Sequence, residues 1–416
     1  MSAQPVSTSL ISTPNLLPPR AWLIIALLWV AAFLNYLDRN MILTMRGSVK
    51  AAIPMTDAQF GLLTSVFLWV YAGVSPFAGY LADRIGRSRV IIASLFIWSV
   101  VTWLTGHAAT FSQLITARAL MGISEACYIP AAFALITDFH RGPTRSRATA
   151  IHLTGFTIGS GMGGIGGWLA ERHDWSYAFF LFGFVGVAHS IVMLLCLRDL
   201  PREEAQAESK IDFLEAIASL LKLSSFRLLL VIWGLLGLAG WAMAGWLPTF
   251  FGERFDLKQG VAGFSATGWL ATAMFIGALV GGAWADRWSL TNPRGRILVP
   301  LAGLCIAAPG IFLLSCSHSL PVAIVGLMLY GARNFTDANM MPVLCLIADP
   351  RYRATGLGVM NLVACTVGGL AIYAGGALRD AHVDVSRVFQ CAAAGLVMCV
   401  VLFAFVKPSA LPAERT

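Results

Sequence analysis

Twelve apolar runs follow one another along the chain, separated by short polar stretches. A helix that crosses a bilayer needs about 20 apolar residues, because hydrocarbon offers no partner to an open backbone. The runs cover residues 21–45, 57–80, 90–109, 111–138, 148–170, 177–197, 224–252, 260–284, 296–316, 321–348, 354–377 and 387–406. The pattern predicts an all-α integral membrane protein with twelve transmembrane helices.

Composition excludes several other classes of protein. Only 12% of the 416 residues are charged and 57% are hydrophobic, whereas soluble domains carry about a quarter charged residues. The net charge of +8 comes from short basic clusters and not from a continuous stripe, so we expect no nucleic-acid partner. No His/Cys/Asp set has metal-ligand or nucleophile spacing in the sequence, so we expect no metal, no cofactor and no enzyme activity.

The longest polar stretch divides the chain. Residues 198–223 separate six apolar runs from the next six, and the second part of this stretch has apolar residues at helical spacing. We predict an amphipathic linker helix there, lying on the membrane surface. The predicted divisions are an N-terminal tail (1–20), a six-helix bundle (21–197), the linker (198–223), a second six-helix bundle (224–406) and a C-terminal tail (407–416).

The basic residues also predict the orientation. Lys and Arg are retained in cytoplasmic loops, and most of them fall in one set of alternate connections, which includes both tails and the linker. The opposite set contains Arg46, Lys50, Arg172, Arg254, Lys258 and Arg379. We therefore predict a multi-pass protein of the bacterial cytoplasmic (inner) membrane with both termini in the cytoplasm.

Short motifs recur in the two halves. Residues 145–149 (RSRAT) match 351–355 (RYRAT), and 79–84 (GYLADR) match 282–287 (GAWADR). Glu125, which precedes Pro130, matches Asp337, which precedes Pro342. Two parallel six-helix repeats about an axis normal to the membrane are the arrangement of one transporter superfold.

Residues 79–89 (GYLADRIGRSR) resemble the signature loop of the major facilitator superfamily, which joins helices two and three. Ser88 departs from that pattern, where a basic residue is usual. The matching positions are Gly79, Asp83, Arg84, Gly86 and Arg87. The resemblance implies that this loop packs on neighbouring cytoplasmic helix ends and stabilises the outward-open state. Asp286 and Arg287 would form its weaker copy.

Two further stretches resemble branches within that superfamily. Residues 34–40 (LNYLDRN) and 122–133 (GISEACYIPAAF) are similar to the anion:cation symporters and also to the Spinster-like lipid transporters. The sequence does not separate the two branches. In both, the resemblance associates Asp38, Arg118 and Glu125 with substrate binding and proton coupling.

Six charged residues lie inside the apolar runs: Asp38, Arg39, Arg118, Glu125, Arg333 and Asp337. Each costs about 2.5–3.5 kcal/mol at the centre of a membrane helix, so it must face a cavity or another charge. From their depth, Asp38 and Arg118 are candidates to pair. Arg333 and Asp337 are four residues apart and can pair within one helix. For each set, a purely structural ion pair is the alternative.

Residues that could line a central cavity are Asn35, Tyr36, Tyr128, Trp241 and Asn334. An anionic substrate that engages an arginine would free a carboxylate to bind a proton. The favoured function is thus proton-coupled symport of a small organic anion, such as a sugar acid or carboxylate, by alternating access in a monomer. The alternatives are a Spinster-like carrier of lysophospholipids or other amphipaths, and a membrane sensor that transports nothing.

Overall fold

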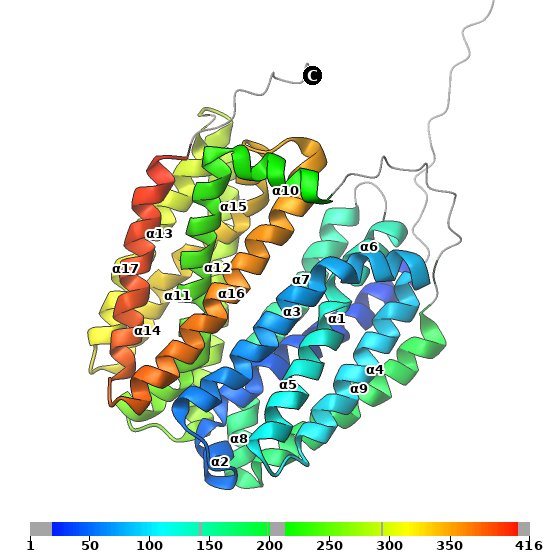
Figure 1. The fold of residues 1–416 in the computed structure, drawn as a ribbon, viewed down its shortest axis with the longest axis vertical. Helices are drawn as coiled ribbons and strands as arrows, with labels where there is room; N and C mark the ends of the chain where they lie inside the picture. The colour runs from blue at the N-terminus through cyan, green and yellow to red at the C-terminus, as the bar shows by residue number, and fades with distance from the viewer. Residues whose placement is uncertain (1–18, 141–143, 198, 200–212, 293, 407–416) are drawn as a thin grey trace, which may run out of the picture.

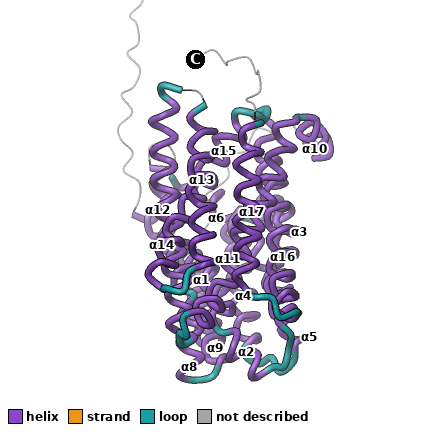
Figure 2. The backbone as a smooth tube through the Cα atoms, turned by 90° about the vertical axis from the view of Figure 1, so that its left-hand side faces the viewer, coloured by secondary structure: helices purple, strands orange, loops and turns teal. Residues whose placement is uncertain are grey.

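A computed structural model describes residues 19–140, 144–197, 199, 213–292 and 294–406. Both predicted tails, apart from residues 19 and 20, and most of the first part of the linker lie outside these ranges. The regular elements of the described residues are all helices (Figure 2), and they gather in two groups (Figure 1).

The N-terminal group contains α1 (Pro19–Thr44), α2 (Arg46–Ala52), α3 (Asp57–Ile85), α4 (Arg87–Thr105), α5 (Phe111–Ala126), α6 (Tyr128–Phe139), α7 (Arg145–Gly161), α8 (Gly164–Arg172) and α9 (Trp175–Cys196). The C-terminal group contains α10 (Phe213–Lys222), α11 (Ser224–Arg254), α12 (Gln259–Ser289), α13 (Gly295–Cys316), α14 (Leu320–Tyr330), η2 (Gly331–Arg333), α15 (Asn334–Cys345), η3 (Pro350–Tyr352), α16 (Arg353–Asp380) and α17 (Val385–Ala404). Figure 1 places α10 and α2 at opposite ends of the molecule. We call these the linker end and the far end.

Each predicted apolar run corresponds to one helix or one interrupted helix. Ten described spans are long and apolar enough to cross a membrane, and one of them joins α5 to α6. The other two runs are broken, into α7 and α8 and into α14, η2 and α15. Both breaks lie against α12: a Cβ on Gly164 would approach the Phe264 nitrogen to 2.3 Å, and one on Gly331 would approach the Ala273 carbonyl oxygen to 2.4 Å. The predicted all-helical membrane fold is confirmed.

Local sequence explains the start and end of α3. Thr56 and Gln59 form a capping box at its first turn. Gly86 ends the helix with φ of 112°, a conformation that favours glycine, and α4 follows at once. The Asp199 carboxylate accepts a hydrogen bond from the Ser88 amide at 2.8 Å and so satisfies the first turn of α4.

The predicted linker helix is present as α10. Its buried residues Ala216 and Leu220 face the C-terminal group, and Leu220 belongs to that group's hydrophobic core. The apolar side of α10 therefore packs on protein in addition to any contact with the membrane surface. The predicted helical positions Ile211 and Leu214 have no described side chains.

The two groups meet most closely where α3 runs beside α16. A Cβ on Gly376 would lie 2.2 Å from the Asp57 carbonyl oxygen, and one on Gly61 would lie 2.8 Å from that of Ile372. The Ser65 hydroxyl donates to the Gly369 carbonyl at 2.6 Å. Backbone thus packs directly on backbone along this contact.

Candidate functional site

A buried ion pair joins the first and fifth helices. Arg39 Nε donates to Glu125 Oε2 at 2.6 Å, and the two side chains are 6% and 0% exposed. The Arg39 guanidinium carbon also lies 4.5–5.0 Å from the ring centroids of Tyr71, Tyr36 and Phe67. One carboxylate and three aromatic faces therefore hold this cation in place.

Asp38 points to a different neighbour. Its Oδ2 accepts a hydrogen bond from the Thr102 hydroxyl of α4 at 3.1 Å, while Oδ1 has no protein partner among the described residues. The pairing of Asp38 with Arg118 that the sequence suggested is wrong, since no ion pair joins these two described residues. Consecutive helical residues point about 100° apart, so Asp38 reaches α4 while Arg39 reaches α5.

Arg118 is fully buried and largely unpaired. Its Nη1 contacts Met121 Sδ at 3.3 Å, whereas Nε and Nη2 have no partner in the described part of the chain. The guanidinium lies 4.8 Å from the ring centroid of Phe67, the ring that Arg39 also contacts. An unpaired guanidinium in such surroundings is costly, and its fork of donors matches a carboxylate or phosphate.

Asn35 completes this cluster. It is fully buried one helical turn before Asp38, and neither of its amide atoms has a hydrogen-bond partner among the described residues. Arg39 Nη2 and Glu125 Oε1 likewise have no hydrogen-bond partner among the described residues. We call Asn35, Asp38, Arg39, Arg118 and Glu125 the N-terminal cluster. It keeps both donors and acceptors free at a site whose four formal charges sum to zero.

The arginine of the C-terminal pair has more of its nitrogens bonded than Arg118 has, although Arg333 Nε has no partner among the described residues. Arg333 Nη1 donates to Asp337 Oδ2 at 2.8 Å, with the side chains 13% and 40% exposed. Arg333 Nη2 donates to the Leu236 carbonyl at 3.2 Å, and Asn334 donates to the Met274 carbonyl at 2.9 Å. No hydrogen bond or ion pair between described residues connects this pair to the N-terminal cluster.

The residues predicted to line a cavity fall into two sets. Tyr36 and Trp241 are half-buried, and Trp241 of the C-terminal group packs against the hydrophobic core of the N-terminal group. Tyr128 is fully buried and donates its hydroxyl to the Leu28 carbonyl at 2.7 Å. In this structure Tyr128 is therefore a packing residue inside the N-terminal group and lines no cavity.

The predicted conformational loop packs on α6. Arg87 forms an ion pair with Asp138 and donates to the Ala134 carbonyl at 2.9 Å, while Arg84 donates to the Tyr80 hydroxyl at 3.3 Å. Gly79 and Asp83 lie in α3, but their side chains are outside the described part. The role of this loop in switching stays a prediction.

The copy of this loop in the second half is open to solvent. Asp286 is 76% exposed, its Oδ1 lies 3.5 Å from Arg296 Nη2, and Arg287 is exposed. Arg84, the counterpart of Arg287 in the first half, is exposed as well.

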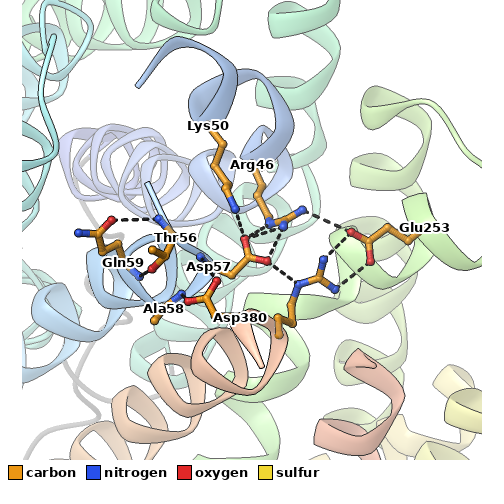
Figure 3. A network of polar contacts seen from close by, with 9 residues as sticks. Arg46, Lys50, Thr56, Asp57, Ala58, Gln59, Glu253 and Asp380 are labelled. Carbon is orange, nitrogen blue, oxygen red and sulfur yellow. Dashed lines mark hydrogen bonds and ion pairs between the residues drawn. The ribbon is translucent and has the colours of Figure 1, made fainter. Parts of the chain in front are cut away.

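Sequence reasoning missed a charged network that crosses between the groups at the far end (Figure 3). Arg46 and Arg379 donate to the two oxygens of Asp57, each at 3.0 Å from its Nε. The members are Arg46, Lys50, Asp57, Glu253, Arg379 and Asp380. Its signal in the sequence was the small set of basic residues on this side, three of which belong to the network.

Comparison with known proteins identifies relatives over most of the chain. The protein spinster of Drosophila melanogaster is 26% identical over 379 residues, which are 86% of this chain but only 62% of that protein. A sphingosine-1-phosphate transporter of Mus musculus is 24% identical and covers 82% of this chain and 67% of its own length. A bacterial homolog of the human lysosomal transporter Spinster, solved in an inward-facing and occupied conformation, has a TM-score of 0.78.

That solved structure is 21% identical and covers 94% of this chain and 97% of its own, so the likeness shows the fold. Of the two branches that the sequence resembles, these comparisons favour the Spinster-like one. The family model of the Major Facilitator Superfamily matches residues 28–373. With helices, repeats and signature loop in agreement, the chain belongs to the major facilitator superfamily, a family of transporters and not of enzymes.

Proposed function

We propose that this multi-pass protein carries an amphipathic lipid with a small anionic or zwitterionic headgroup, of the lysophospholipid class, together with a proton. The preference between the two predicted substrates is thereby reversed, because the comparisons favour the alternative over the small organic anion. The observation that carries the proposal is the fully buried Arg118, whose Nε and Nη2 have no partner among the described residues and whose guanidinium shares the Phe67 ring with the Arg39–Glu125 pair.

Charge balance supports the proton. The N-terminal cluster sums to zero, so a phosphate or carboxylate that binds Arg118 adds a negative charge in a medium of low dielectric constant. A proton taken up by Asp38 or Glu125 restores neutrality, which makes joint binding cheaper than separate binding. Asp38 has an oxygen available for this, since Thr102 occupies only its other oxygen.

The surroundings of the cluster support an amphipath. Tyr36, Phe67 and Tyr71 present aromatic faces beside the two guanidinium groups. A headgroup on Arg118 would therefore lie against apolar walls that suit an acyl or sphingoid chain. Tyr36, the half-buried ring, packs on Phe156 and marks the accessible edge of the cluster.

The small organic anion remains the second candidate, because the Arg118 fork fits a carboxylate as well as a phosphate. The predicted orientation, with both termini and the linker end cytoplasmic, belongs to the same proposal. The division of the chain at residues 198–223 and the monomeric state are also part of the proposal.

Flux in proteoliposomes tests the proposal. The purified protein in liposomes is supplied with a lysophospholipid or a sugar acid, with and without an imposed pH gradient. The test variant is Arg118→Gln, and the control is Arg333→Gln, which also removes an arginine from a membrane helix. We expect gradient-dependent lysolipid movement that falls at least about 100-fold in Arg118→Gln, since two charge-assisted hydrogen bonds contribute about 1.5–3 kcal/mol each. Movement of the sugar acid alone would support the second candidate, and binding without flux would support the sensor.

A further inference from the structure

The contacts between the two groups are unevenly distributed along the molecule. The hydrogen bonds and ion pairs that cross between described residues of the two groups involve α2, the first half of α3 and α7–α8 on one side. On the other side they involve the end of α11, the start of α12 and the second half of α16. These segments all lie from mid-molecule to the far end, where the groups are therefore fastened together.

Asp57 is the centre of the fastening. It is buried at the first residue of α3 and receives Arg46 and Lys50 from its own group and Arg379 from the other. Arg379 in turn binds Glu253 through two hydrogen bonds of 2.7 and 2.8 Å. Networks of this kind are worth more than isolated surface pairs, because each ion holds the next in place.

Asp380 adds a contact of another kind. Its two carboxylate oxygens accept the backbone amides of Asp57 at 2.8 Å and Ala58 at 2.9 Å (Figure 3). The first turn of a helix has amides without partners in the helix itself, and a carboxylate there is favoured. The last residue of α16 thus caps α3 across the boundary between the groups.

We propose that Arg46, Lys50, Asp57, Glu253, Arg379 and Asp380 form a far-end latch, which stabilises the conformation closed at this end and must break whenever the end opens. Opening separates α3 from α16, so the two capped amides and the Asp57 carboxylate all lose their partners in the other group. The latch shifts the equilibrium between the closed and open far end, and this effect does not depend on which substrate is carried.

Water can reach the latch from the far end. Arg46 and Glu253 line a cavity of about 160 Å³ between the groups, and Glu253 is 51% exposed. The outer part of the latch is therefore screened by salt, whereas the buried contacts of Asp57 are not. Because the exposure of the charged groups differs across the network, the network can open without moving every one of them from a buried site into water.

Hydrogen–deuterium exchange of the full chain in nanodiscs tests the latch. The variant is Arg379→Gln, and the control is Arg254→Gln, which removes a charge at the same end but donates to the Ser317 carbonyl within the C-terminal group. The informative amides are those of Gly164 and Gly260, which bond across the groups to Thr267 and Glu171 and lie outside the latch. Amides inside α13 report whether each variant is folded.

We expect Arg379→Gln to speed exchange at Gly164 and Gly260 by at least about fivefold, because a larger share of molecules is open at the far end. The control should leave both rates unchanged. Faster exchange at Asp57 and Ala58 alone would reduce the network to a local helix cap and overturn the proposal, as would an equal response in the control. No substrate is present, so a failed flux experiment would not affect this result.

Discussion

Glu125 and Asp337 occupy matching positions in the two repeats, yet their partners differ. Glu125 binds Arg39 of another helix and is fully buried, whereas Asp337 binds Arg333 of its own helix turn and is 40% exposed. The first pair exists only when the whole N-terminal group is assembled, and beside it Arg118 is left unpaired. The two halves thus differ in how they hold charge: one has an incomplete cluster that joins different helices, and the other has a pair four residues apart.

The largest effect should come from breaking the buried pair. We expect Glu125→Gln to lower the free energy of unfolding by about 3–5 kcal/mol, because Arg39 is left charged and buried without its partner. An SDS titration of the purified protein measures it. The double variant Arg39→Met with Glu125→Leu should recover most of the loss, and a double variant as unstable as Glu125→Gln would show that the pair is not what supports this half.

A smaller effect should follow from disturbing the helix that presents the cluster. A Cβ on Gly159 would lie 2.2 Å from the Phe33 carbonyl oxygen of α1, so Gly159→Ala must push α1 away. We expect a loss of about 1–3 kcal/mol and weaker substrate binding. Gly358→Ala is the control, since nothing lies within 4 Å of a Cβ there. Equal melting temperatures for the two variants would contradict the close packing of α1 on α7.

Removing the unpaired arginine should separate function from stability. We expect Arg118→Met to change the free energy of unfolding by no more than about 1 kcal/mol, because the lost charge had no carboxylate bonded to it, the new side chain fills the same space, and a proton on Asp38 or Glu125 restores the neutrality of the cluster. Calorimetry should at the same time detect no binding of the transported lipid. A large loss of stability would instead make Arg118 a structural member of the cluster.

The smallest effect is expected in the C-terminal pair. Asp337→Asn should cost less than about 1 kcal/mol, since water screens a partly exposed i,i+4 pair and Arg333 keeps its bond to the Leu236 carbonyl. Flux and unfolding midpoint are both measured in this variant. A loss as large as that of Glu125→Gln would remove the difference between the two halves.

Much of the scaffold follows from periodicity and length. The apolar runs gave the positions of the helices, and the repeated motifs and the loop at 79–89 gave the family, which the family model confirms. The interruptions of α7–α8 and α14–α15 did not follow, because they depend on glycine backbone meeting α12. Such a contact exists only after distant segments have packed.

The charged site was located from the sequence but paired wrongly. A charged residue within an apolar run can be recognised from the sequence alone. Which residue faces α5, Asp38 or Arg39, depends on how α1 is rotated about its axis, and the sequence does not give that rotation. The far-end latch was missed for a related reason. Asp57 and Arg379 stand at the ends of apolar runs, where charges are ordinary, and they are 322 residues apart in sequence.

The glycine contact between α3 and α16 also limits how this transporter could be inhibited. With backbone touching backbone at Gly61 and Gly376, no side chain larger than a hydrogen atom fits at these two positions, so a drug-like molecule does not fit between the helices there either. A compound meant to hold the two groups in one arrangement would have to bind elsewhere on the molecule.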